Sequence, residues 1–210
     1  MTVADPSTLL GNVFSYASMT ALAPDYDIGF VLLVAGNSTT GTAEHLTDTI
    51  IASIFPALEE TARQQAHKQF AGTYESTTES LVSSNITLTT QVGQPGLVID
   101  SWYSNGTNFL AAIAGVEGVK APATLDARMY PSGLSQEMAT GQRIGFRAVY
   151  GSTATSPNAG YVGGECSSWG SVDSPRYGNV GVDEFEFVVE GGEVVSLSPR
   201  ALRVVLKKTA

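Results

Sequence analysis

Residues 57–76 read ALEETARQQAHKQFAGTYES, and this stretch separates two kinds of pattern in the 210-residue chain. Its first part carries apolar residues at helical spacing and runs into Gly72, which predicts a helix that ends there. After Gly72 apolar and polar residues alternate, as they do in half-buried strands. We therefore expect a mixed N-terminal part over residues 1–69 and a β-rich part over residues 70–210.

The N-terminal part has the pattern of two strands and one helix. Residues 13–23 and the apolar run 28–35 flank a polar turn, which predicts an antiparallel hairpin, and residues 1–12 have the composition of a frayed terminus. A helix capped by Thr42, or alternatively by Thr40, would follow. Because Pro56 lacks the N–H that the helix interior needs, a kink or a second helix is expected there. The predicted buried face consists of Leu46, Ile50, Ile54 and Leu58, reinforced by Ile51 and Phe55.

Turn residues divide the β-rich part into short segments of alternating pattern. So many short strands favour a closed or nearly closed antiparallel barrel, and hence a mainly β (α+β) fold. The composition of 108–115 also fits a short helix. Residues 151–181, rich in Gly, Ser, Pro and Asn, read as long loops. The strand candidates are 72–79, 85–92, 96–103, 108–114, 124–131, 143–150, 183–190, 193–198 and 201–207.

Charge and hydropathy exclude several classes of partner. The formal net charge is −9 and no cluster of basic residues is present, so nucleic acid would be repelled. No apolar run is long enough to span a bilayer, and the first residues do not resemble a signal peptide, which predicts a cytoplasmic protein without a membrane partner. Cys166 is the single cysteine, so an internal disulfide is excluded.

Several stretches resemble known proteins. The segments YASMTALAPDYDIGFVLLVAGN (16–37) and QAHKQFAGTY (65–74) resemble the end of the catalytic lobe of fungal serine β-lactamase-like proteins, which belong to the penicillin-binding-protein-like group. The segments SWYSNGTN (101–108), CSSWGSVDSPRYGN (166–179) and DEFEFVVEGGEVVSLSPRALRVVL (183–206) resemble the lipocalin-like β-barrel domain that follows this lobe. The resemblance implies a lipocalin-like barrel after a remnant of the lobe, and relatives that are secreted.

The catalytic motifs of that group are missing. Its enzymes acylate a serine in an S-x-x-K motif, and no lysine of this chain follows a serine at that spacing. Leu9 stands where the resemblance places the lysine of a K-T-G-type triplet. Tyr103-Ser104-Asn105 matches Y-x-N as a string, but it falls in the barrel part as a strand-to-turn element. We therefore expect no serine hydrolase activity from this chain alone.

Other reactive side chains have plain structural explanations. His45 and His67 have polar neighbours and are expected on the surface, and Cys166 has no basic neighbour that would lower its thiol pKa. The acidic and aromatic residues of 183–186 alternate as in a strand with one solvated face. Neither a metal site nor a cofactor is expected.

Aromatic and arginine side chains gather in the predicted barrel strands. In strand 143–150 the alternation puts Arg143 and Arg147 on one face and Phe146 and Tyr150 on the other. Inward aromatic residues of a small barrel either fill its core or line a cavity for one small apolar ligand. On the second interpretation, the candidate ligand-binding residues are Trp102, Tyr103, Arg128, Tyr130, Arg143, Phe146, Tyr150 and Trp169.

These observations lead to three hypotheses about function. A barrel without the serine machinery could be a cofactor-independent cyclase or isomerase of secondary metabolism, which holds a flexible substrate in a reactive fold. It could instead be a non-catalytic barrel that binds a small ligand, or a hydrolase fragment that needs a separate catalytic lobe. Because a lone hairpin is only marginally stable, the N-terminal hairpin and helix are expected to pack on the barrel or to form a homodimer.

Overall fold

The computed structural model describes residues 7–23, 26–77, 84–119, 124–152 and 173–209. The chain divides into two compact units, Met1–Gln64 and Gln65–Ala210. The division falls inside the long helix α1 (Thr39–Phe70). The sequence pattern had placed the corresponding boundary after residue 69, in the same helix.

The first unit contains an antiparallel sheet of three strands in the order β1-β2-β3. These strands are β1 (Ser7–Val13), β2 (Tyr16–Ala23) and β3 (Ile28–Ala35). The predicted hairpin corresponds to β2 and β3. The expectation of a frayed terminus over residues 1–12 is wrong for β1, because a two-residue turn folds it back so that Val13 pairs with Tyr16. Phe14 in this turn has a φ of 52°, the sign that tight hairpin turns require.

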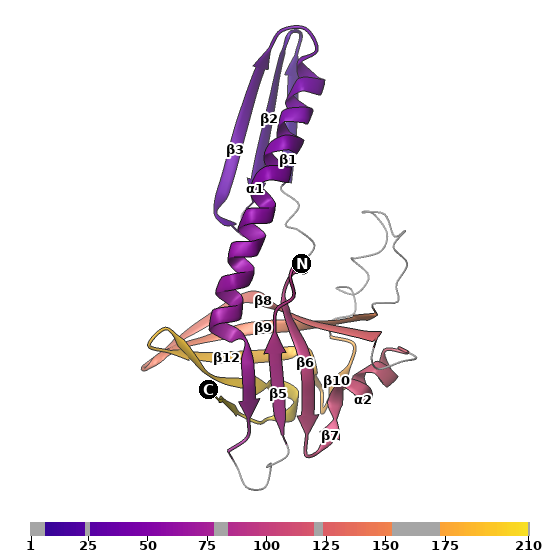
Figure 1. Ribbon diagram of the computed structural model, residues 1–210, viewed down its shortest axis with the longest axis vertical. Helices are drawn as coiled ribbons and strands as arrows, with labels where there is room; N and C mark the ends of the chain where they lie inside the picture. The colour runs from indigo at the N-terminus through magenta and orange to yellow at the C-terminus, as the bar shows by residue number, and fades with distance from the viewer. Residues whose placement is uncertain (1–6, 24–25, 78–83, 120–123, 153–172, 210) are drawn as a thin grey trace. The chain divides into compact units, whose positions relative to one another are not determined.

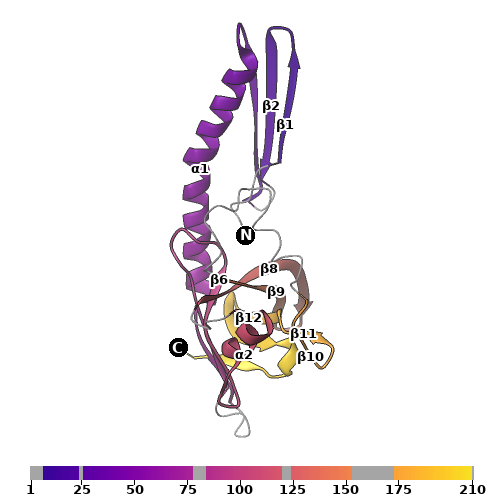
Figure 2. The ribbon, with the colours of Figure 1, turned by 90° about the vertical axis from the view of Figure 1, so that its right-hand side faces the viewer.

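Helix α1 is continuous from Thr39 to Phe70, with Pro56 inside it, so no second helix begins near the proline. The helix begins three residues before the predicted cap Thr42, whose N–H and hydroxyl both donate to the carbonyl of Ser38. Figure 2 shows α1 lying along the sheet of the first unit. The residues that pack on the sheet include Ala43, not the predicted Leu46 and Ile54, which are 41% and 43% exposed.

The position of this contact has a steric explanation. Ala17 and Met19 of β2 pack with Ala43, and Leu32 and Val34 of β3 lie against this cluster. Small side chains on both elements let the helix backbone approach the sheet closely, which moves the buried stripe away from the larger leucine and isoleucine. Further along α1, Phe55 packs edge-on against Tyr26, with 6.0 Å between ring centroids.

The second unit is a closed antiparallel barrel, which confirms the predicted fold class. Among the described residues, eight strands follow one another in the order β5-β4-β14-β13-β12-β9-β8-β6, and β6 pairs again with β5 (Figure 1). These strands are β4 (Gly72–Glu75), β5 (Asn85–Thr89), β6 (Leu97–Ser104), β8 (Leu125–Met138), β9 (Gly141–Ser152), β12 (Glu184–Glu190), β13 (Glu193–Pro199) and β14 (Leu206–Lys208).

Shorter elements complete this unit and correct two strand predictions. In place of the candidate strand 108–114 the chain forms helix α2 (Phe109–Val116), as the helical alternative expected, and the Asn108 side chain caps it. The candidate strand 201–207 is instead the turn η4 (Arg200–Leu202) followed by the short β14. β7 (Thr107–Asn108) pairs with β6, while β10 (Arg176–Tyr177) and β11 (Val180–Gly181) pair with each other.

Aromatic side chains fill the inside of the barrel. Phe187 packs against Phe70 and Phe146, with ring centroids 5.0 and 4.8 Å away. Trp102 packs in the same core against Phe109 and Phe185, at 4.5 and 5.2 Å. Since the inward positions are occupied by side chains in contact, the charged and polar residues of the same strands project from the outer wall.

Candidate functional site

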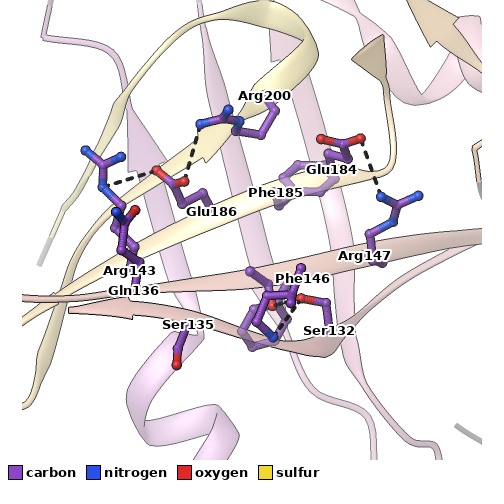
Figure 3. A pocket seen from close by; sticks show the side chains of 12 residues that line it. Ser132, Ser135, Gln136, Arg143, Phe146, Arg147, Glu184, Phe185, Glu186 and Arg200 are labelled. Carbon is purple, nitrogen blue, oxygen red and sulfur yellow. Dashed lines mark hydrogen bonds and ion pairs between the residues drawn. The ribbon is translucent and has the colours of Figure 1, made fainter.

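A groove of about 260 Å³ lies on the outer wall of the barrel (Figure 3). Its walls come from β8, β9 and β12, which are neighbours in the sheet, and from η4. All of its residues belong to the second unit. The groove therefore depends on the barrel alone.

A bulge in β8 shapes one wall of the groove. Pro131 pairs with Phe146 and Ser135 pairs with Ile144, so three residues of β8 lie opposite the single residue Gly145. The Ser132 hydroxyl donates to the carbonyl of Gly145 at 2.9 Å, which fixes the bulge on β9. Bulges of this kind re-aim side chains and are frequent beside functional sites.

Strand alternation decides which side chains line the opposite wall. Arg143, Gly145 and Arg147 of β9 share the outer face with Glu184 and Glu186 of β12, because Arg147 pairs with Glu184 and Gly145 pairs with Glu186. Gly145 carries no side chain, and Ser132 of the bulge occupies the space between the two arginines where a β-carbon would lie, with Oγ 2.8 Å away. Four charged residues of the groove, Arg143, Arg147, Glu184 and Glu186, therefore come from outward-facing positions on adjacent strands.

The charges are distributed unevenly along the groove (Figure 3). At one end the Glu186 carboxylate lies between two guanidinium groups, 3.7 Å from Arg143 and 3.3 Å from Arg200. At the other end Arg147 lies between two carboxylates, 2.5 Å from Asp183 and 3.4 Å from Glu184. One end therefore carries a surplus positive charge and the other a surplus negative charge when all six groups are ionised.

Asp183, behind the negative end, is fully buried. Burial raises the pKa of its carboxyl group, while the charge of Arg147 acts in the opposite direction. Tyr150 is buried nearby and donates a hydrogen bond to the carbonyl of Val182 at 3.0 Å. Burial, together with the negative charge of Asp183, raises the pKa of this phenol. Neither group is exposed to solvent.

The structure places two of the predicted ligand-binding residues at this groove, namely Arg143 and Phe146. Trp102 lies in the packed core, and Tyr150 is buried beside Val182. Tyr103 is 38% exposed on the other face of its strand. Ligand binding by the predicted set stays a prediction.

The two remaining described candidates are buried in β8. Arg128 donates hydrogen bonds to both carboxylate oxygens of Asp126, and also to the carbonyl of Pro95 and the side chain of Gln91. Tyr130 covers Gly96, where any β-carbon would meet its ring at 2.7 Å. Trp169 and Cys166 lie outside the described residues.

The sequence prediction missed Arg200, Glu184 and Glu186 as members of a site. The alternation of residues 183–186 had been interpreted as a solvated face, and the outward position of both glutamates agrees with that interpretation. The alternation cannot predict that Arg200, which follows β13, lies close to Glu186 in the folded chain.

In the part of the chain that the structure describes, no group of three or more His, Cys, Asp or Glu side chains could hold a metal ion. None of the helices over these residues has the length and apolar character needed to cross a membrane.

Comparison with known proteins identifies relatives of the chain. A Beta-lactamase-like protein of Arthroderma benhamiae is 28% identical over 219 residues, which cover 92% of this chain and 36% of the relative. Probable hydrolase M10 of Phoma sp. is 28% identical over 107 residues, which cover 50% of this chain and 17% of the relative. Probable hydrolase clz13 of Cochliobolus lunatus is 26% identical over 104 residues, covering 50% and 16%.

The chain thus spans little more than a third of the length of the first of these relatives, and less of the other two. No solved structure matches it. A family model with the description "Beta-lactamase-like-like, C-terminal domain" matches residues 62–210, which include the whole described barrel. The chain belongs to this β-lactamase-like family.

Proposed function

We propose that this chain is the non-catalytic, barrel-bearing part of a β-lactamase-like hydrolase. On this proposal it works with a catalytic lobe, carried on the same polypeptide or on another. The observation that carries the proposal is the outer face of the sheet β1-β2-β3. Large apolar side chains stand exposed on this face, which we call the outer sheet face, and a lobe that packs on them would remove them from water.

Strand register defines the outer sheet face. Along β2 the buried residues alternate with Tyr16, Ser18, Thr20 and Leu22, so these four point away from α1. Their paired neighbours on β1 and β3 share the same face. The large apolar residues exposed there are Leu9, Val13, Tyr16, Leu22, Val31 and Leu33. A patch of this kind on one sheet face is typical of an interaction surface.

The edge of the same sheet adds support. Within the described sheet, β3 pairs with β2 on one side and has no strand on its other side. Its sequence is IGFVLLVA, without a charge or a proline. Natural edge strands that face water are generally short, charged or interrupted, so a long apolar edge favours pairing with a further strand.

The sequence also supports the view that catalysis belongs to a separate lobe and not to this chain. No S-x-x-K motif occurs among the 210 residues, and acylation of a serine in that motif requires the nearby lysine. The two relatives whose names contain the word hydrolase are much longer than the segment that matches this chain. A catalytic lobe from the unmatched part of such a protein has the size to cover the outer sheet face.

The proposal is tested by mixing the chain with the unmatched part of the Arthroderma benhamiae relative, produced separately. Light scattering after gel filtration should show a one-to-one complex, and hydrolysis of p-nitrophenyl acetate should require the lobe. Leu33→Lys should weaken the complex at least about tenfold, because it places a charge in an apolar contact. Leu33 is 81% exposed, so this change leaves folding intact.

Gln94→Lys serves as the matched control, because Gln94 lies in an exposed turn of the barrel. It should leave the complex unchanged. A stable homodimer of the chain alone that Leu33→Lys dissociates would replace the lobe by a second copy. Ester hydrolysis by the chain alone would contradict the proposal directly.

A cofactor-independent cyclase or isomerase is the alternative that the sequence favours. It would need an internal cavity lined by residues such as Trp102 and Phe146, and both of these pack against neighbouring rings at 4.5 to 5.2 Å. Because these rings fill the interior, the alternative has less support than the proposal that a catalytic lobe docks on the outer sheet face, which we call the lobe-docking function. Incubation with a metabolite extract, followed by chromatography of the recovered molecules, would favour it if a mass-neutral isomer formed.

A further inference from the structure

We propose that the groove between β8, β9 and β12 binds a small zwitterionic molecule whose carboxylate and ammonium groups lie roughly 7 Å apart, as in a dipeptide. The distance is that between Glu184 and Glu186, which are two residues apart on one face of β12 and mark the two ends of the groove. This inference depends on the second unit only and stands independently of the lobe-docking function.

The shape of this groove is part of the fold and does not depend on a side chain swinging away. The bulge of β8 is seated over Gly145, where any β-carbon would meet Ser132 Oγ at 2.8 Å. Ser132 is held there by its hydrogen bond to the Gly145 carbonyl. Leu134 projects from the bulge and is 73% exposed, which offers an apolar contact beside the charges. Gly145 thus admits the bulge, and the fixed bulge sets the shape of this wall of the groove.

The positive end has capacity for a carboxylate. Arg143 and Arg200 share the single carboxylate of Glu186, and each ion pair runs from one guanidinium nitrogen. A guanidinium group carries five N–H donors in a planar fork that suits carboxylates. A ligand carboxylate between these two arginines would balance the surplus positive charge while Glu186 stays in place.

The negative end has the complementary capacity for an ammonium group. Arg147 faces both Asp183 and Glu184, and Asp183 is fully buried behind it. Glu184 is the accessible carboxylate of this pair, with its side chain 40% exposed. An ammonium group that donates to Glu184 would balance the surplus negative charge at this end.

The size of the groove favours a small molecule. Its volume of about 260 Å³ is just below the range of ordinary ligand pockets, which begins at roughly 300 Å³. An extended polyanion would meet the chain's net charge of −9 and would satisfy only the positive end. A zwitterion of dipeptide size engages both ends at once.

The test is a calorimetric titration of the chain with glycyl-leucine, compared with N-acetyl-glycyl-leucine and with glycyl-leucinamide. Saturable binding of glycyl-leucine is expected, and each blocked peptide should bind about tenfold more weakly because one end loses its partner. The double variant Arg143→Gln/Arg200→Gln should abolish the preference for the free carboxylate. Glu184→Gln should abolish the preference for the free amine.

Arg176→Gln is the matched control, because Arg176 pairs with Asp173 at the surface and does not line the groove. It should leave all three affinities unchanged, and thermal unfolding should confirm that each variant is folded. Equal affinity for the three peptides, or no saturable binding of glycyl-leucine, would overturn the proposal. So would an equal loss of binding in the Arg176 control.

Discussion

Arg147 of β9 lies 2.5 Å from the carboxylate of Asp183, and Asp183 is completely buried while Arg147 remains partly exposed. The pair ties the beginning of the β12 segment to the adjacent strand, where Ala148 also donates its N–H to the Asp183 carbonyl. One charge is thus removed from water, and within the described part of the chain its ion-pair partner is one cation on the neighbouring strand. Such pairs are sensitive to the loss of one partner.

Replacing Arg147 by Met tests this dependence. The change removes the cation and leaves the buried Asp183 carboxylate uncompensated, so the free energy of unfolding should fall by about 3–5 kcal/mol. Urea denaturation followed by tryptophan fluorescence measures it. Arg143→Met is the control, since Arg143 is exposed and Glu186 keeps Arg200, and it should cost at most about 1 kcal/mol. Equal losses in the two variants would refute a special role for Asp183.

The carboxyl group of Asp183 should also make the stability of the folded chain depend on pH. Burial, opposed only in part by Arg147, raises the pKa of Asp183 above its ordinary value of 3.8. The folded state then holds a proton that the unfolded state has released, so stability falls as pH rises from 3.8 to the raised pKa. The difference in unfolding free energy between the wild type and Asp183→Asn should shrink or change sign over this window. A difference independent of pH would show that Asp183 titrates normally.

Substitution of Trp102 tests whether the barrel interior is a packed core or a ligand cavity. It is almost completely buried and contacts Phe109 and Phe185. Trp102→Ala should reduce the free energy of unfolding by about 3–5 kcal/mol, because it removes contacts and leaves a cavity. The neighbouring Tyr103→Ala, on the exposed face, should cost about 1 kcal/mol or less. A small loss at Trp102 would favour a ligand-lined interior.

Asn108 sets the beginning of α2. Its side-chain oxygen accepts a hydrogen bond from the N–H of Ala111 at 3.1 Å. Asn108→Ala should therefore cost about 1 kcal/mol, whereas Asn108→Asp keeps the acceptor and should cost less. Chemical denaturation of both variants provides the comparison. If alanine and aspartate behaved alike, the cap would contribute nothing measurable.

Much of the barrel follows from local pattern. The candidate strands 96–103 and 183–190 correspond to β6 and β12 within one residue at each end, because alternation and turn residues are local signals. Strand β1 was not predicted, because its pairing with β2 is set by the tight turn at Phe14. Phenylalanine is not a residue type that indicates a turn with positive φ. The sequence pattern also did not predict the bulge at Ser132 or the greater length of β8.

The groove could be predicted only in part. Cross-strand pairs such as Arg147 with Glu184 depend on register, and one residue of slip would reverse the faces. Arg200 lies fourteen residues from Glu186 in the chain, so their contact belongs to the tertiary structure. Arg143 was identified for its place among aromatic residues, but it faces outward, away from the core that Phe146 helps to fill.

The most direct test of the lobe-docking function is hydrogen–deuterium exchange of β3 (Ile28–Ala35) with and without the separately produced catalytic lobe. The account predicts that exchange in β3 slows by about tenfold or more on addition of the lobe, while β6 (Leu97–Ser104) in the barrel is unaffected. Unchanged exchange in β3 at saturating lobe would contradict the claim that the outer sheet face and its edge form the docking surface.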